Sequence, residues 1–256
     1  MRLVDTHSHL HFSNFNDNRP EVYERAVAAR VTRILCVGTT LEDSATAINY
    51  AQSQDGVWAA VGVHPHEAAA LVDSGKPGLK DMQKMLGREK VVAVGEIGLD
   101  YYKSTTPKDV QEKALRLQLE AGLETKVPFS FHVRDAWSDF WRIIDDYQAI
   151  SGVVHSFASG RKQLDAALNR GLYVGLNGIM TITRDQAQLE AAKLVPLNKL
   201  LLETDAPFLS PAPFRNETCE PKHVAVTAEF LAELRHESLS ELAEQTTSNS
   251  VKLFNL

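Results

Sequence analysis

Short apolar runs rich in β-branched residues recur along the chain and alternate with longer charged segments. Eight such runs are candidate strands: Leu3–Val4, Ile34–Val37, Trp58–Val63, Val91–Val94, Phe129–Phe131, Val153–Val154, Leu172–Leu176 and Leu200–Leu202. Apolar strands that alternate with helices indicate a parallel sheet covered by helices. Eight such units predict closure into a TIM-type (β/α)8 barrel, and an open doubly wound sheet is the structural alternative.

The segments between these runs have apolar residues at helical spacing, for example in Arg19–Arg30, Pro107–Thr125, Trp137–Tyr147, Lys162–Asn169 and Gln186–Leu194. Two further helices are expected at the C-terminus, at about His223–Arg235 and Leu239–Phe254. The Pro-rich stretch from Pro207 to Pro221 predicts a long loop after the last strand.

The length of 256 residues matches one barrel of roughly 250 residues, so we expect a single domain over residues 1–256. The first strand continues as Asp5-Thr-His-Ser-His9 rather than as a Gly-rich phosphate loop. The dinucleotide-binding version of an open sheet therefore has no support in the sequence.

No apolar run approaches the roughly 20 residues that span a bilayer, and Asp5 and His7 precede any signal-peptide core. The two cysteines, Cys36 and Cys219, are too few for a disulfide framework. These features predict a cytoplasmic protein without membrane association. The net charge of −6 disfavours a broad basic surface for nucleic acid, but it permits a nucleic-acid substrate at a local site.

Six side chains able to bind a metal follow five of the predicted strands: His7, His9, Glu96, His132, His155 and Asp205. The carboxyl ends of barrel strands form the active-site rim. Strand side chains alternate, so His7 and His9 project to the same side. One such histidine alone fits an ordinary hydrogen-bonded residue. The same pattern at five strand ends indicates a metal site.

Six protein ligands exceed the three of a mononuclear catalytic zinc site, whereas two ions sharing a carboxylate use all six. Our hypothesis is that Glu96 bridges both ions, with His7, His9 and Asp205 on one ion and His132 and His155 on the other. Imidazole and carboxylate ligands suit two divalent ions, whether zinc, manganese or magnesium. We expect Asp205 to accept the proton of an activated water, which makes Asp205 and Glu96 the candidate catalytic residues.

The positive charge of two divalent ions exceeds the negative charge of the carboxylates of Glu96 and Asp205. The site would therefore be locally positive and attract an anionic substrate. His64 follows the third strand at the rim and is a candidate substrate contact. Arg134 shares the face of His132 and is a candidate phosphate ligand. Glu203, two residues before Asp205, is a candidate for orienting a histidine, and a core ion pair is the alternative.

The chain resembles the TatD family of metal-dependent deoxyribonucleases, within the amidohydrolase-like barrel superfamily. The resemblance covers nearly the whole chain. The matching segments are Asp5-Thr-His-Ser-His, Gly62-Val-His-Pro, Gly95-Glu-Ile-Gly-Leu-Asp-Tyr, His132-Val-Arg-Asp-Ala, His155-Ser-Phe and Glu203-Thr-Asp-Ala-Pro. The resemblance implies a TIM-type barrel, a divalent-metal pair on the six residues above, and hydrolysis of phosphodiester bonds in DNA from the 3′ end. It also implies that His64 lies near the substrate.

The loop after the last strand departs from the family pattern, which is Arg-Gly-Lys-x-Asn-Glu-Pro. Here the loop reads Arg215-Asn-Glu-Thr-Cys-Glu-Pro221, with Glu217 and Cys219 at the Lys and Asn positions. Arg215 is kept and is a third candidate substrate contact. The change replaces a cation by an anion and bears on the affinity for DNA.

The expected substrate is DNA, at single-stranded ends, and we expect a monomer without an obligate protein partner. The alternative function is an amidohydrolase or lactonase acting on a small cyclic amide, ester or lactone, because the same metal chemistry polarises carbonyl groups. Many such barrels bridge their metals with a carbamylated lysine after the fourth strand, where this chain has Glu96. A third alternative is a metal-containing binding protein.

Overall fold

A computed structural model describes residues 2–256 of the chain. The strands are β1 (Leu3–Ser8), β2 (Val31–Val37), β3 (Val57–Val61), β4 (Val91–Asp100), β5 (Phe129–Arg134), β6 (Gly152–Val154), β7 (Tyr173–Leu176) and β8 (Leu200–Leu202). They form one sheet in the chain order β1 to β8. The pairings within the sheet are parallel, as in β4 with β5 and β7 with β8.

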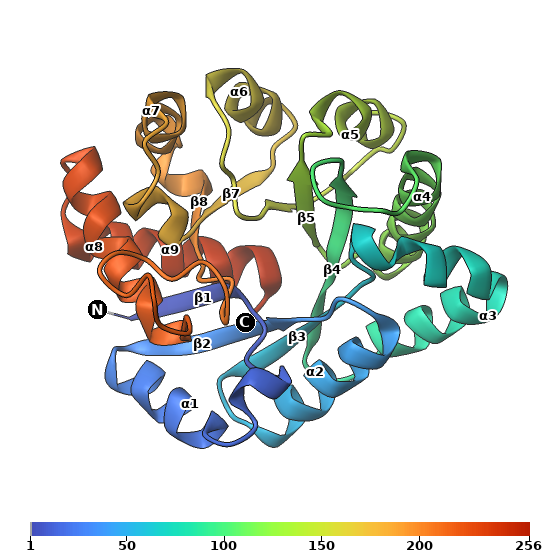
Figure 1. Cartoon of the computed structure of the whole chain (residues 1–256), viewed down its shortest axis with the longest axis horizontal. Helices are drawn as coiled ribbons and strands as arrows, with labels where there is room; N and C mark the ends of the chain where they lie inside the picture. The colour runs from blue at the N-terminus through green and yellow to red at the C-terminus, as the bar shows by residue number, and fades with distance from the viewer. Residues whose placement is uncertain (1) are drawn as a thin grey trace. The chain divides into compact units, whose positions relative to one another are not determined.

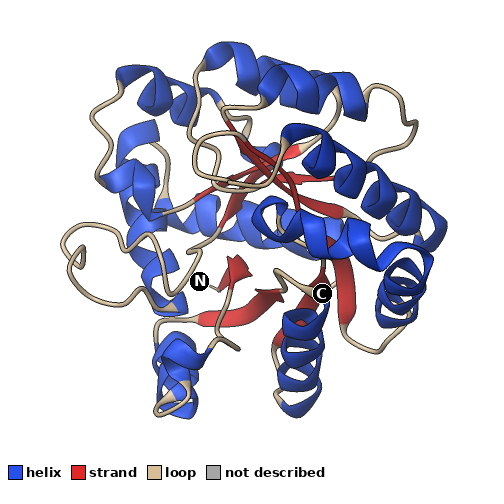
Figure 2. Ribbon diagram, turned by 45° about the vertical axis from the view of Figure 1, so that its right-hand side comes forward, coloured by secondary structure: helices blue, strands red, loops and turns tan. Residues whose placement is uncertain are grey.

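A helix follows each strand in the chain order. Figure 2 distinguishes the strands in red, the helices in blue and the connecting loops in tan. The α-helices are α1 (Arg19–Ala28), α2 (Leu41–Ser53), α3 (Ala68–Leu86), α4 (Lys108–Thr125), α5 (Trp137–Ile144), α6 (Arg161–Asn169), α7 (Gln186–Leu194), α8 (Val224–Arg235) and α9 (Leu239–Phe254). Short 3-10 helices are η1 (Ser13–Phe15), η2 (Pro65–Glu67), η3 (Gly178–Thr181), η4 (Leu197–Lys199) and η5 (Pro221–His223). This order confirms the predicted fold class, a TIM-type (β/α)8 barrel with C-terminal helices.

Three strands that carry candidate ligands, β1, β4 and β5, are longer than the sequence predicted. The run Leu3–Val4 extends to Ser8 in β1, and the run Val91–Val94 extends to Asp100 in β4. Gly, Asp and Glu are poor strand formers, so the sequence pattern ends early, but pairing with β5 continues to Asp100. Glu96 therefore lies inside β4 rather than one step beyond its end.

The fold divides into two compact units. Unit 1 comprises Met1–Cys36 with His155–Leu256, and unit 2 comprises Val37–Val154. Each unit is described by itself below. The expectation of a single domain over residues 1–256 remains a prediction.

Unit 1 is organised around the pairs of strands β1 with β2 and β7 with β8, which α8 and α9 adjoin (Figure 1). The three residues of β8 are leucines, all buried. The side-chain amide of Asn249 in α9 donates to the carbonyls of Leu197 and Leu200 at 2.8 and 2.9 Å. These bonds hold the last helix against the start of β8.

Unit 2 contains β3 to β6, with α3 and α4 packed side by side (Figure 1). Phe129 and Phe131 of β5 are buried and stack at 5.4 Å, and Phe140 of α5 meets Phe131 edge-on at 5.2 Å. The side chain of Gln118 in α4 bonds both the N–H and the carbonyl of Val63. The buried polar backbone after β3 is thereby satisfied.

Within residues 2–256, no helix is both long enough and apolar enough to cross a lipid bilayer. Cys36 and Cys219 are free and buried. Burial raises the pKa of the Cys36 thiol to about 12, so this thiol is an inert core residue.

The two helices α6 and α7 of unit 1 offer a matched test of the core. Leu164 in α6 is buried, whereas Leu194 at the end of α7 is 46% exposed. We expect Leu164→Ala to lower the free energy of unfolding by about 2–5 kcal/mol, because it leaves a cavity. Leu194→Ala should change it by about 0.5 kcal/mol or less. Urea unfolding of both variants measures the difference, and equal midpoints would contradict the described packing.

Candidate metal-binding residues

The six predicted ligands are distributed over both units. His7, His9, His155 and Asp205 belong to unit 1, and Glu96 and His132 belong to unit 2. In each unit, a carboxylate lies among imidazoles at the carboxyl ends of parallel strands.

In unit 1, the carboxylate of Asp205 faces two histidines. Its Oδ1 lies 3.4 Å from Nε2 of His9 and 3.7 Å from Nε2 of His7. One donor atom from each of the three residues falls within 4.8 Å of the others. Burial favours the neutral form of Asp205, but the hydrogen bond from His9 and the charges of His7 and His155 outweigh it and hold the pKa of this carboxyl below its usual range. Asp205 is therefore an anion at neutral pH.

Backbone hydrogen bonds bring Asp205 to the histidines. The N–H of Asp205 donates to the carbonyl of His7 at 2.8 Å, and the N–H of His9 donates to that of Ala206 at 2.7 Å. Asp205 has a left-handed φ of 63°, a conformation that Asp tolerates better than most residues. The chain leaving β8 thus turns at Asp205 and runs beside the end of β1.

Asp5 of β1 also bonds the segment after β8. Its carboxylate accepts the N–H of Thr204 at 2.9 Å and the hydroxyl of Thr204 at 2.6 Å. The side chain is fully buried, and burial raises the pKa of Asp5 to about 8 despite those hydrogen bonds. Asp5 therefore links the two chain segments that carry His7 and Asp205.

His155 lies in unit 1 beside His7 and Glu203. Its ring stacks on that of His7, with centroids 3.8 Å apart and planes 13° apart. Its Nδ1 is 3.6 Å from Oε1 of Glu203, an oxygen that also accepts the N–H of Ser156 at 2.5 Å. Glu203 is fully buried, and among the described residues its Oε2 has no hydrogen-bond partner. A Cβ at Gly175 would collide with this carboxylate, so a glycine makes room for it.

In unit 2, the carboxylate of Glu96 faces His64 and His132. Its Oε1 lies 2.8 Å from Nδ1 of His132 and 3.6 Å from Nε2 of His64. Donor atoms of these three residues lie within 4.8 Å of one another. His64, a predicted substrate contact, therefore meets the predicted bridging carboxylate.

Asp100 is a site residue that the sequence reasoning missed. Its Oδ2 lies 3.2 Å from Nε2 of His132 and 3.0 Å from Nε2 of His66, while its Oδ1 accepts the N–H groups of Tyr102 and Lys103. Burial opposes ionisation, but the hydrogen bonds from His132 and these N–H groups hold the pKa of Asp100 well below its usual range. The spacing of four residues between Glu96 and Asp100 was the available signal, because residues two and four positions apart on a strand face the same side.

Gly98 lies between these two carboxylates and pairs with His132 in the sheet. It has a φ of 151°, and a Cβ at this position would collide with the carbonyl oxygen of His132. Only glycine lets β5 approach β4 closely enough for His132 to reach both Glu96 and Asp100.

The two predicted arginine contacts are exposed. Arg134 ends β5, and its guanidinium lies 4.1 Å from the ring centroid of Tyr102. Arg215 lies in the loop between β8 and η5. In that loop Glu217 is exposed, Cys219 is buried, and Glu220 forms a two-pronged ion pair with Arg25 at 2.9 and 2.8 Å. The family-atypical Glu217 is thus a surface charge, whereas Cys219 is part of the loop packing.

These donor sets fit divalent cations. Imidazole nitrogens and carboxylate oxygens are the ligands that zinc, manganese and, with added water, magnesium accept. In unit 1, the buried oxygen Oε2 of Glu203 has no hydrogen-bond partner among residues 2–256, so a polar group there is left for a further partner. The residues present therefore fit a metal-binding role.

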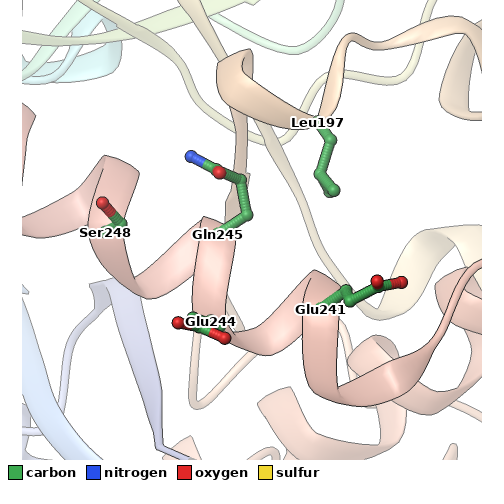
Figure 3. A pocket seen from close by; sticks show the side chains of 5 residues that line it. All are labelled: Leu197, Glu241, Glu244, Gln245 and Ser248. Atoms are coloured by element: carbon green, nitrogen blue, oxygen red, sulfur yellow. The ribbon is translucent and has the colours of Figure 1, made fainter.

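A separate hollow lies on α9 beside η4 (Figure 3). It is lined by Leu197, Glu241, Glu244, Gln245 and Ser248. None of these side chains is an imidazole, a thiol or a cation, and two carboxylates alone define no site. We assign this hollow no function.

Comparison with known proteins extends these observations. The family model described as TatD related DNase matches residues 4–255. An uncharacterized metal-dependent hydrolase, YabD of Bacillus subtilis, is 35% identical over 99% of both chains. The protein named 3′-5′ ssDNA/RNA exonuclease TatD of Citrobacter rodentium is 34% identical over 99% of this chain and 98% of its own. The crystal structure of YJJV, a TatD homolog from Escherichia coli K12, superposes with a TM-score of 0.91 at 30% identity, over 100% of this chain and 98% of that one.

The barrel topology, the histidine and carboxylate clusters and these relatives define a metal-dependent hydrolase acting on ester bonds. The chain belongs to the TatD-related DNase family.

Asp100 provides a test of the unit 2 geometry. Asp100→Ala should lower the free energy of unfolding by about 1–3 kcal/mol, because it leaves the N–H groups of Tyr102 and Lys103 without their acceptor. The control is Asp81→Ala. Asp81 is exposed, its ion pair among residues 2–256 is with Lys84, and its replacement should change the free energy of unfolding by about 0.5 kcal/mol or less. Urea unfolding measures both, and an Asp100→Ala effect as small as the control's would contradict the described hydrogen bonds.

Proposed function

We propose that the chain hydrolyses phosphodiester bonds in DNA as a 3′-exodeoxyribonuclease of TatD type. The observation that carries the proposal is the same arrangement in both units: Asp205 facing His7 and His9, and Glu96 facing His64 and His132. A relative of similar length, 34% identical, is named a 3′-5′ ssDNA/RNA exonuclease. We take single-stranded DNA ends as the substrate.

We assign the six predicted ligands to one binuclear centre. In this assignment His7, His9 and Asp205 would hold one ion, His132 and His155 would hold the other, and Glu96 would be shared by both. The support is the grouping of His7 with His9 and Asp205, the contact of His132 with Glu96, and the rule that barrel strands present their carboxyl ends at one rim. We propose magnesium, manganese or zinc as the ions.

When bound, two divalent ions polarise a phosphoryl oxygen and lower the pKa of a water molecule. The protein's own residues supply the remaining steps. Asp205, held as an anion by its histidines, accepts the proton of the attacking water. Glu203 orients the ring of His155 through Nδ1, as ligand histidines are commonly oriented by a carboxylate. His64, Arg134 and Arg215 bind the phosphates of the substrate.

The net charge of −6 makes a local cation cluster, rather than a basic surface, the expected means of holding DNA. A monomer without an obligate protein partner, acting in the cytoplasm, remains our prediction from the sequence.

Glu96 gives the direct test of the activity. The purified protein with manganese or magnesium should release the terminal nucleotide of single-stranded DNA labelled at its 3′ end. Glu96→Ala should lower kcat about 100-fold or more, because it removes the shared carboxylate. The control is Glu124→Ala, an exposed residue of α4 whose carboxylate accepts a hydrogen bond from the side chain of Gln83. Circular dichroism of both variants checks that the fold is retained.

The same preparation should be offered a panel of lactones and cyclic amides. Intact DNA beside rapid turnover of one of these would refute the nuclease proposal in favour of an amidohydrolase or lactonase. Full activity of Glu96→Ala on DNA would refute the assignment of Glu96.

Metal content tests the binuclear centre separately. Elemental analysis of protein dialysed against manganese or zinc should approach two ions per chain, and Asp205→Asn should weaken the binding of one of them. Loss of this carboxylate removes a charge that two histidines face. A tightly held stoichiometry of one in the wild type would contradict bridging by Glu96.

A further inference from the structure

The ends of β4 and β5 in unit 2 carry an exposed group of aromatic and basic side chains. Tyr102, just after β4, is 57% exposed. The guanidinium of Arg134 lies 4.1 Å from the centroid of its ring, and the ammonium of Lys103 lies 5.8 Å from it. Next to it, Lys108 lies 4.2 Å from the ring centroid of Tyr101. We call Tyr102, Lys103 and Arg134 the Tyr102 cluster.

The cations of this cluster lack acidic partners. Among residues 2–256, no carboxylate forms an ion pair with Lys103 or Arg134. Two other arginines of unit 2 are neutralised: Arg116 pairs with Asp146 at 2.7 Å and Arg142 with Glu112 at 2.8 Å. In a chain of net charge −6, two adjacent unneutralised cations mark a local site for an anion.

The sheet places this cluster next to the candidate ligands of unit 2. Gly98 pairs with His132, and two residues further along, Asp100 pairs with Arg134. Two residues of a strand advance by about 7 Å. Asp100 completes the connection, because one of its oxygens meets His132 and the other accepts the N–H groups of Tyr102 and Lys103. The Tyr102 cluster therefore lies about two strand residues beyond His132, in the direction of the carboxyl ends of β4 and β5.

From this arrangement we infer that the Tyr102 cluster binds the single-stranded nucleic acid substrate next to the bond that is cut. A base stacks on the exposed part of Tyr102, while Arg134 and Lys103 bind the adjoining phosphates. Proteins bind single strands by combining stacking on aromatic side chains with cations along the backbone. Arg134 also holds the tyrosine ring in place, since a guanidinium over an aromatic face is attracted to it. This inference rests on the proposed nuclease function and adds the substrate site to it.

An exposed tyrosine distinguishes this ligand from a small anion. Arg134 and Lys103 alone would serve any phosphate, but a stacking surface matters only for a ligand with bases. A solvent-exposed aromatic held in place by a cation is preorganised for such a ligand, which lowers the entropy cost of binding.

Binding to the full-length protein tests the inference without turnover. Fluorescence anisotropy of a 5′-labelled oligothymidylate is measured in the presence of a chelator, so that no hydrolysis occurs. We expect Tyr102→Ala to weaken binding about 10-fold, and Tyr102→Phe to bind like the wild type because the ring is kept. Arg134→Gln should weaken binding and reduce the salt dependence by about one counterion.

A second tyrosine and arginine pair of the same unit supplies the matched control. Arg116 lies 6.0 Å from the ring centroid of Tyr147, but Tyr147 lies in the loop between α5 and β6, which leads into the amino end of β6 instead of following the carboxyl end of a strand. Tyr147→Ala and Arg116→Gln should leave oligothymidylate binding unchanged. Thermal unfolding of all variants identifies any that are misfolded.

The outcomes separate this inference from the proposed function. Unchanged binding in both Tyr102→Ala and Arg134→Gln, with 3′ label released by the wild type, would overturn the inference and leave the nuclease proposal standing. Binding that depends on Tyr102, without release of label in manganese or magnesium, would support the inferred binding site and refute the nuclease proposal. Wild-type protein that neither binds nor cleaves would refute both. Equal weakening of inorganic polyphosphate binding by Tyr102→Ala would refute the stacking role, because polyphosphate has no bases.

Discussion

Two backbone hydrogen bonds between the end of β1 and the segment after β8 determine the geometry of unit 1. They join the first and last strands of the sheet at His7, His9, Asp205 and Ala206. These bonds involve the backbone of the candidate ligands themselves. The contact between the two chain segments therefore also brings the side chains of His7, His9 and Asp205 together. Asp5 and Thr204 fix the same junction one step deeper. The residues that complete the sheet in this unit are thus the residues that form its candidate metal ligands.

Much of this organisation could be predicted from the sequence. The eight apolar runs and the helical segments between them carry strong periodicities, and the order of strands follows from short parallel connections. His7, His9 and Asp205 could be grouped because they follow the first and last strands. The resemblance to the TatD family, read from six motifs, is confirmed by the family model that matches residues 4–255.

Other features could not be predicted, because they depend on register. Pairing of β1 with β2 slips by one residue between Asp5 and Ser8, and pairing of β4 with β5 slips between Val94 and Ile97. His7 and Glu96 lie within these two irregular segments. An extra residue in one strand redirects side chains, so simple alternation does not apply there. The contacts of Asp100 and the stacking of Arg134 on Tyr102 likewise depend on where β5 lies against β4, which the spacing of residues along β4 alone does not give.

In the loop after β4, the hydrogen bonds of Asp100 do not depend on which side chains the loop carries. Asp100 holds the loop by backbone N–H groups, whereas the side chains of Tyr102 and Lys103 are exposed. A new side chain at either position keeps the same backbone hydrogen bonds, and with them the contact of Asp100 with His132. In our proposal, substrate preference therefore changes at these two positions while the contacts of Asp100 stay the same, so relatives that share one hydrolytic chemistry can diverge in what they degrade.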